Sequence, residues 1–150
     1  MFTEQDNQLI EKEFEVLRLA SLKRCANQGE YEVVLKAFDF AKAAHNGVRR
    51  RSGEPYILHP ISVAQIVVQE IGLGYKSIVA ALIHDVVEDT EYTLEDIERL
   101  FGAKVASLVD GLTKIKSAFD SKTSSQAENF KRILLTLNDD VRVILIKLAD

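Results

Sequence analysis

Apolar side chains recur along most of the chain at the three- and four-residue spacing of an α-helix. In the first stretch, Ile10, Phe14 and Leu17 share one stripe, and Thr3 before it is a residue type that caps helices. Further helices follow, most of them ended by glycine, asparagine or a polar turn. The predicted helices cover about 4–26, 30–45, 60–71, 76–89, 94–101, 103–113, 126–137 and 140–150.

The alternation of apolar and polar residues that marks a β-strand is almost absent, so the predicted fold class is all-α. Two polar segments separate the helices. The first, 48–56, is basic and rich in turn-forming residues, and the second, 116–125, is rich in serine. We expect both segments to be loops.

The last predicted helix, 140–150, is nearly all apolar from Val141 to Ala149, which predicts that it is buried in the core. The sequence stops at Asp150 without a capping residue or a helix breaker. Because domains seldom end inside a core helix, we expect the chain to be a fragment of a longer protein, truncated at its C-terminus.

Composition narrows the class of protein. The 150 residues are 47% hydrophobic and 28% charged, which excludes intrinsic disorder. A single cysteine, Cys25, cannot form an internal disulfide, which favours the cytoplasm. No apolar run approaches the roughly 20 residues of a membrane span, so no membrane partner is expected. The formal net charge of −4 argues against direct nucleic-acid binding but does not exclude a phosphorylated ligand on a local basic patch.

The first candidate for chemistry is the pair His84-Asp85. Apolar residues flank the pair on both sides, so it is predicted to lie in or beside the core, where an uncompensated carboxylate is costly. A divalent cation would compensate both side chains. Glu88 and Asp89 follow four residues after each of them, on the same faces of the predicted helix, where they could orient or deprotonate water. The alternative is a His–carboxylate hydrogen bond within the core.

Two further residues extend this set. His59 stands at a predicted helix start, where it could instead cap or pack, and Asp150 is a lone acid on the apolar last helix, where it could instead belong to a frayed end. Together with His84 and Asp85 they make a set of two histidines and two carboxylates. Such a set suits manganese, iron or zinc and fits calcium poorly.

The only dense positive cluster in the sequence runs from Arg49 to Gly53. Arginine forks can bind phosphate and stack on a base, although a solvated turn is the alternative. His45 precedes this cluster at the end of a predicted helix, where a histidine interacts favourably with the helix dipole, and we interpret it as structural.

Four segments, in this order, resemble the hydrolase domain of the RelA/SpoT homologues, which belongs to the HD superfamily of metal-dependent phosphohydrolases. They are RRSGEPYILHPI at 50–61, HDVVEDT at 84–90, DGLTK at 110–114 and KLAD at 147–150. The resemblance runs from about residue 34 to residue 150. It implies one HD domain over 1–150, with N-terminal helices at 4–46 and a metal and nucleotide core at 47–150.

The resemblance also implies an activity, which is removal of the 3′-pyrophosphate of (p)ppGpp in the stringent response, with Mn²⁺ as the usual metal. Matched by motif, the metal ligands would be His59, His84, Asp85 and Asp150. The acidic pair handling the attacking water would be Glu88 and Asp89, and the nucleotide loop would be Arg50, Arg51 and Ser52. In this family the helix continues beyond the position of Asp150, and synthetase and regulatory domains often follow.

Two alternatives remain open. One is an HD phosphohydrolase acting on another nucleotide, and the other is a catalytically silent module that senses the nucleotide or regulates a neighbouring domain.

Overall fold

The computed structural model describes residues 2–120 and residue 146. The described part is helical, which confirms the predicted all-α class. Its elements are α1 Glu4–Leu22, α2 Gln28–Ala44, α3 Leu58–Ile66, the π-helical turn η1 Val67–Ile71, α4 Tyr75–Ile83, α5 Val86–Asp89, α6 Leu94–Phe101 and α7 Ala103–Asp120.

Two helices begin with the same capping device, as the threonines before them predict. Thr3 accepts a hydrogen bond from the Asp6 backbone N–H, and the Asp6 carboxylate accepts one from the Thr3 N–H. Thr93 and Asp96 repeat this reciprocal pair at the start of α6. Each box satisfies two backbone donors that the first helical turn leaves without an intrahelical partner.

The structure corrects three predicted boundaries. The first helix ends at Leu22 rather than near residue 26, and the predicted third helix changes into the π-helical turn η1 for its last residues. Helix α7 continues to Asp120, so the loop predicted from residue 116 is helical over 116–120. The remainder of that loop and the helices predicted at 126–137 and 140–150 lie outside the described residues, except for Ile146, which is helical and buried.

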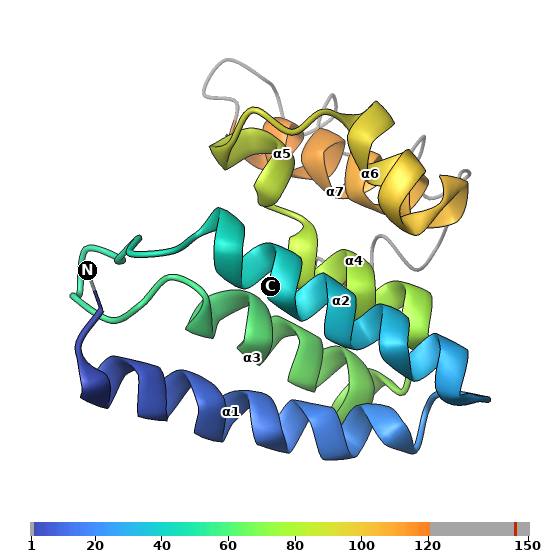
Figure 1. The fold of residues 1–150 in the computed structure, drawn as a ribbon. Coiled ribbons are helices and arrows are strands. Elements are labelled where there is room, and N and C mark those ends of the chain that lie inside the picture. The colour runs from blue at the N-terminus through green and yellow to red at the C-terminus, as the bar shows by residue number, and fades with distance from the viewer. Residues whose placement is uncertain (1, 121–145, 147–150) are drawn as a thin grey trace.

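The most informative correction concerns the helix predicted over 76–89. It is interrupted at His84 and Asp85, and the chain resumes as the four-residue helix α5 in a new direction (Figure 1). Asp85 has φ −91° and ψ −5°, in the sparsely populated region between helix and strand where many active-site residues are found. Hydropathy alone does not reveal this turn, because the apolar residues continue through Val86 and Val87.

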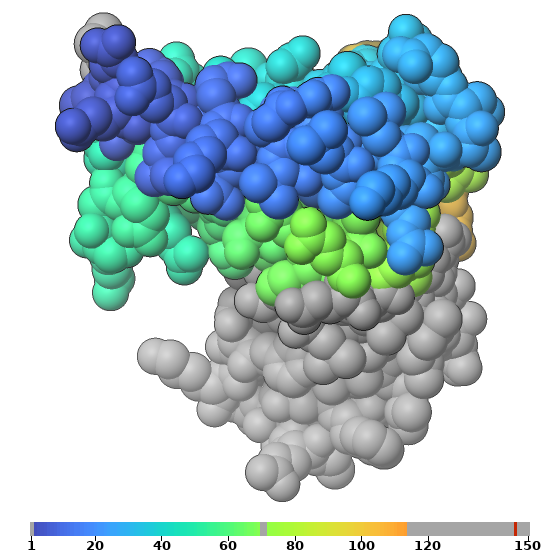
Figure 2. All heavy atoms as spheres, turned by 90° about the horizontal axis from the view of Figure 1, so that it is seen from below, coloured from blue at the N-terminus to red at the C-terminus, as the bar shows by residue number. Residues whose placement is uncertain are grey.

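The helices surround one apolar core. Helix α4 contacts α2, α3 and α7, and α1 packs along α3 (Figure 1). Every residue of α4 from Ser77 to Ile83 is buried, so α4 is the central element. From below, α1 lies across one face, and the segment between α2 and α3 extends beside its N-terminal end (Figure 2). Among the described residues, no helix combines the length and apolarity needed to cross a bilayer.

A pair of leucines on α1 tests how strongly the core determines stability. Leu17 is fully buried, so Leu17→Ala leaves a cavity and should lower the free energy of unfolding by about 3 kcal/mol. Leu19 is 51% exposed on the same helix, so Leu19→Ala should change it by less than about 0.5 kcal/mol. Urea denaturation of both variants gives the comparison, and equal losses would contradict the packing described for α1.

Candidate metal centre

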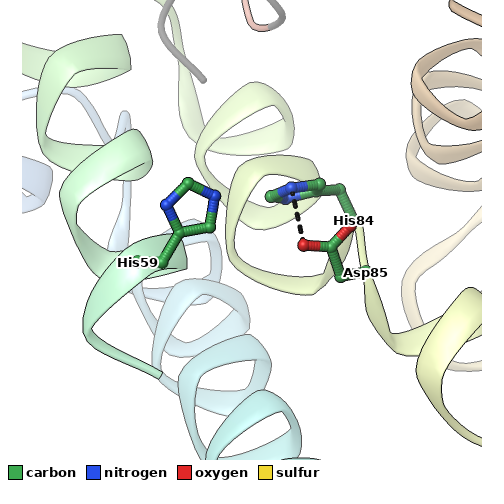
Figure 3. Close-up of side chains that lie close together, drawn as sticks. All are labelled: His59, His84 and Asp85. Carbon is green, nitrogen blue, oxygen red and sulfur yellow. Dashed lines mark ion pairs between the residues drawn. The ribbon is translucent and has the colours of Figure 1, made fainter. Parts of the chain in front are cut away.

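Three of the predicted metal ligands lie together at the edge of the core. His59 comes from the first turn of α3, and His84 and Asp85 come from the turn after α4. Each of the three residues offers one possible ligand atom, and these three atoms all lie within 4.8 Å of one another. In Figure 3 the His59 ring faces the His84 ring across the gap between the two helices, and the Asp85 carboxylate lies beside His84.

Local backbone structure explains how His59 reaches this place. The loop before α3 turns into the helix through hydrogen bonds from the Leu58 and His59 N–H groups to the Pro55 and Tyr56 carbonyls. Pro60 follows in the first turn, where its missing N–H costs no intrahelical bond. His59 therefore sits on the end of α3 closest to the loop, with buried Ile57 and Ile61 anchoring the turn.

The hydrogen bonding of His84 indicates how its ring is used. Its Nδ1 lies 2.6 Å from the Ala81 carbonyl oxygen, an acceptor, so Nδ1 carries a proton. Its Nε2 lies 3.2 Å from Asp85 Oδ2. Either a proton on Nε2 or a cation between the two groups makes this approach favourable. A backbone carbonyl on Nδ1 is also one of the common outer partners of a metal-bound histidine.

The donor set fits a divalent transition metal. It offers two imidazole nitrogens and a carboxylate, with His84 7% and Asp85 9% exposed. Nitrogen and carboxylate donors together suit manganese, iron or zinc better than calcium. The fourth predicted ligand, Asp150, lies outside the described residues.

Tyr56 belongs to the site, although no pattern in the sequence predicts a role for it. Its hydroxyl group donates a hydrogen bond to Asp85 Oδ2. Its ring lies beside that of His59, with centroids 6.0 Å apart. The available signal was its position three residues before His59, in the turn that leads into the helix.

The acidic pair Glu88 and Asp89 follows the metal cluster on α5. Both side chains are exposed, and the Asp89 N–H donates to the Asp85 carbonyl at 2.9 Å, which joins α5 to the cluster. The prediction of one continuous helix through these four residues is wrong, because the helix is interrupted at His84 and Asp85 and the two acids stand on the separate helix α5. Asp89 Oδ2 instead lies 3.2 Å from Nε2 of His45.

Arg50, Arg51 and Ser52 are exposed on the loop between α2 and α3. The loop is held in shape by hydrogen bonds from the Arg50 N–H to the Glu54 carbonyl and from the Gly53 N–H to the Arg50 carbonyl. Gly53 has φ +100°, which only glycine adopts readily. A hydrogen bond from Ser52 and the charge of Arg50 lower the pKa of the Glu54 carboxyl group.

The next arginine, Arg49, anchors this loop to the first turn of α1. Its Nη2 lies 2.5 Å from Asp6 Oδ2, and its guanidinium lies 5.4 Å from the centre of the Phe2 ring. Hydrogen bonds from Arg49 and from the Thr3 N–H lower the pKa of the Asp6 carboxyl group to about 2. The basic loop is therefore tied to the amino-terminal helix.

Comparison with known proteins places these features in a family. The family described as "HD domain" matches residues 37–150. The bifunctional (p)ppGpp synthase/hydrolase SpoT of Escherichia coli (strain K12) is 51% identical over 116 residues, which are 77% of this chain and 16% of that protein. A guanosine-3′,5′-bis(diphosphate) 3′-pyrophosphohydrolase of Aquifex aeolicus is 45% identical over 119 residues, 79% of this chain and 17% of that protein.

A GTP pyrophosphokinase of Myxococcus xanthus is 45% identical over 125 residues, 81% of this chain and 16% of that protein. A solved structure titled "A metazoan ortholog of SpoT hydrolyzes ppGpp and plays a role in starvation responses" superposes with TM-score 0.62 and 34% identity, covering 78% of this chain and 65% of that one. This chain spans about a sixth of the length of the curated relatives named here.

The Asp6–Arg49 contact predicts a pH dependence. Because the pKa of Asp6 is lowered on folding, the contact stabilises the fold above about pH 4 and is lost as the pH falls towards 2. Arg49→Ala should raise the pKa of Asp6, though not fully, since the Thr3 N–H still donates. Carboxyl ¹³C NMR titration measures this, and Asp96, in the matching capping box of α6, should not move. An unchanged Asp6 would contradict the contact.

Metal binding makes a separate prediction. A ligand that binds only the folded state at a hundred times its Kd raises the free energy of unfolding by about 2.7 kcal/mol. Thermal unfolding with increasing MnCl₂ should therefore show a rising midpoint that is abolished by Asp85→Ala. Asp39→Ala removes an exposed carboxylate from α2 and should retain the full effect. Equal responses of the two variants to MnCl₂ would place the metal elsewhere.

Proposed function

This chain belongs to the HD domain family, and on that basis we propose that it hydrolyses the 3′-pyrophosphate of the guanosine alarmones (p)ppGpp. The observation that carries the proposal is the convergence of His59, His84 and Asp85 within 4.8 Å. Relatives named for this hydrolysis are similar over about three-quarters of the chain, and the chain also resembles a solved structure whose title reports it.

His59, His84 and Asp85 would hold one divalent ion, with Asp150 as the proposed fourth ligand and Mn²⁺ as the proposed metal. When bound, such an ion polarises phosphoryl oxygens and lowers the pKa of a water molecule. The protein contributes the fixed arrangement of donors. The Ala81 carbonyl orients the His84 ring, and the Tyr56 hydroxyl group holds one oxygen of Asp85.

Glu88 and Asp89 are the proposed acids that orient the attacking water and accept its proton. A carboxylate within reach of the water is a suitable general base, and both acids follow the metal cluster by one turn of chain. Their exposure leaves them accessible to solvent and substrate. In the proposed reaction water attacks the phosphorus atom that is bonded to the 3′ oxygen. The bond between that phosphorus and the 3′ oxygen breaks, and the 3′ oxygen takes up a proton. The products are pyrophosphate with GDP or GTP.

The loop of Arg50, Arg51 and Ser52 is the proposed contact for the guanine nucleotide. Exposed guanidinium groups bind phosphate through paired N–H donors and stack on a base through their flat face. The loop leads directly into Tyr56 and His59, so a nucleotide held by it would lie within a few residues of the metal ligands along the chain. Because the net charge is −4, local contacts rather than long-range attraction would hold this polyanion.

The chain would act as the hydrolase part of a longer cytoplasmic protein, with synthetase and regulatory domains as proposed neighbours. The competing function is a silent module that binds the nucleotide without turnover. The name of the Myxococcus xanthus relative, GTP pyrophosphokinase, favours keeping this alternative, since it names synthesis rather than hydrolysis.

An assay of the protein with ppGpp and MnCl₂ separates these functions. We expect release of GDP and pyrophosphate that stops on addition of EDTA. Asp85→Ala should lower kcat/KM at least about a hundredfold, because the metal contributes several kcal/mol to transition-state stabilisation. Asp39→Ala serves as the control and should retain turnover. Nucleotide binding without product would support the silent module, and unchanged turnover in Asp85→Ala would refute the hydrolase site.

A further inference from the structure

One buried histidine lies outside the roles assigned so far. His45 ends α2 and is 2% exposed, which makes it one of the most deeply buried polar residues of the described chain. Burying an imidazole is unfavourable unless both nitrogens find partners. An apolar residue of similar size would fill the same space without this cost, so helix capping and packing alone do not account for the ring.

Two of the residues that His45 contacts, Asp89 and Tyr56, belong to the proposed site. Its Nδ1 lies 3.3 Å from the Ala41 carbonyl oxygen, one turn back along α2, and its Nε2 lies 3.2 Å from Asp89 Oδ2. Both partners are acceptors, so each contact is favourable only when the ring nitrogen that faces it donates. The face of the ring packs against Tyr56, with centroids 4.5 Å apart and an angle of 41° between the rings.

We propose that His45 is a positioning residue that fixes the direction of the Asp89 carboxylate and supports the Tyr56 ring. This inference rests on the proposed function of Asp89 as one of the two acids that act on water. His45 reaches Asp89 from 44 residues earlier in the chain, and helix α2 carries it.

Asp89 needs such support because its own element provides little. Helix α5 has four residues, and the Asp89 side chain is 45% exposed. An aspartate at the end of so short a helix can rotate into solvent, where its carboxylate would point in many directions. A hydrogen bond from a buried ring restricts that rotation, since the ring itself is held by Ala41 and Tyr56.

The second contact extends the effect to the metal ligands. Tyr56 packs on His45 and donates its hydroxyl hydrogen to Asp85. His45 therefore lies between the acidic pair on α5 and the carboxylate of the metal cluster. Loss of the Nε2 donor alone should disturb Asp89, whereas loss of the whole ring should disturb both.

Two substitutions remove the ring and its contact with Tyr56 and differ in where the side-chain nitrogen lies, so the comparison between them isolates the Nε2 donor. The side-chain nitrogen of asparagine overlays Nδ1 of histidine, and that of glutamine overlays Nε2. His45→Asn retains the donor towards Ala41 and loses the donor towards Asp89, so we expect kcat to fall 10- to 100-fold with KM within about twofold. His45→Gln restores a donor at the Nε2 position, so its kcat should exceed that of His45→Asn by about tenfold, although the lost ring contact with Tyr56 keeps it below the wild type.

The double variant supplies the coupling test. If His45 acts through Asp89, then His45→Asn should reduce kcat little further in a background that already carries Asp89→Asn. A purely structural role predicts that Asn and Gln lower kcat together with the midpoint of thermal unfolding, and that the double variant shows the product of the single effects. Either result would overturn the proposal.

A measurement without turnover keeps this inference distinct from the proposed function. In carboxyl ¹³C NMR of the free protein, His45→Asn should shift the Asp89 resonance and leave that of Asp39 in place, and His45→Gln should shift Asp89 less. If the wild type fails to hydrolyse ppGpp, the proposed function fails while this readout still tests the contact. An Asp89 resonance that does not respond to His45→Asn would overturn the positioning role.

Discussion

Two imidazoles and a carboxylate lie within 4.8 Å of one another at the edge of an apolar core, and this placement is favourable only when their charges are balanced. The structure meets this condition through specific neighbours. A backbone carbonyl fixes the proton on one nitrogen of His84, and a phenol group donates to Asp85. The possible ligand atoms of His59, His84 and Asp85 lie close enough together to bind one divalent cation. The start of α3 and the turn after α4 hold these three side chains next to one another.

Helix α4 provides the rigid support for that arrangement. Its buried residues contact three other helices, so the turn that follows it has a fixed starting point. The turn is followed by α5, on which Glu88 and Asp89 are exposed. A single interruption of the helix thus separates groups that need burial from groups that need access to water. Helix α5 has only four residues and restricts its own side chains little, so the contact from His45 at the end of α2 helps to orient Asp89.

Much of this could be read from the sequence, because its signals are local. Helical spacing located α2 and α6 well, and threonine caps located two helix starts. The proximity of His59 to His84 followed from motif order rather than from any local rule. The interruption at His84 was missed because apolar residues continue on both sides. The contacts of Tyr56 with Asp85 and of His45 with Asp89 join residues 29 and 44 positions apart, and no periodicity in a single sequence encodes such pairs.

The contact between Arg49 and Asp6 bears on how far this domain could be shortened at its amino-terminal side. The segment matched by the HD domain family starts at residue 37, so Asp6 lies outside it while Arg49 and the basic loop lie inside. The first turn of α1 therefore helps to hold the loop although it lies outside the segment that the family matches. A chain shortened to begin at residue 37 would keep the whole segment that the family matches and would still lose Asp6, the anchor of the loop.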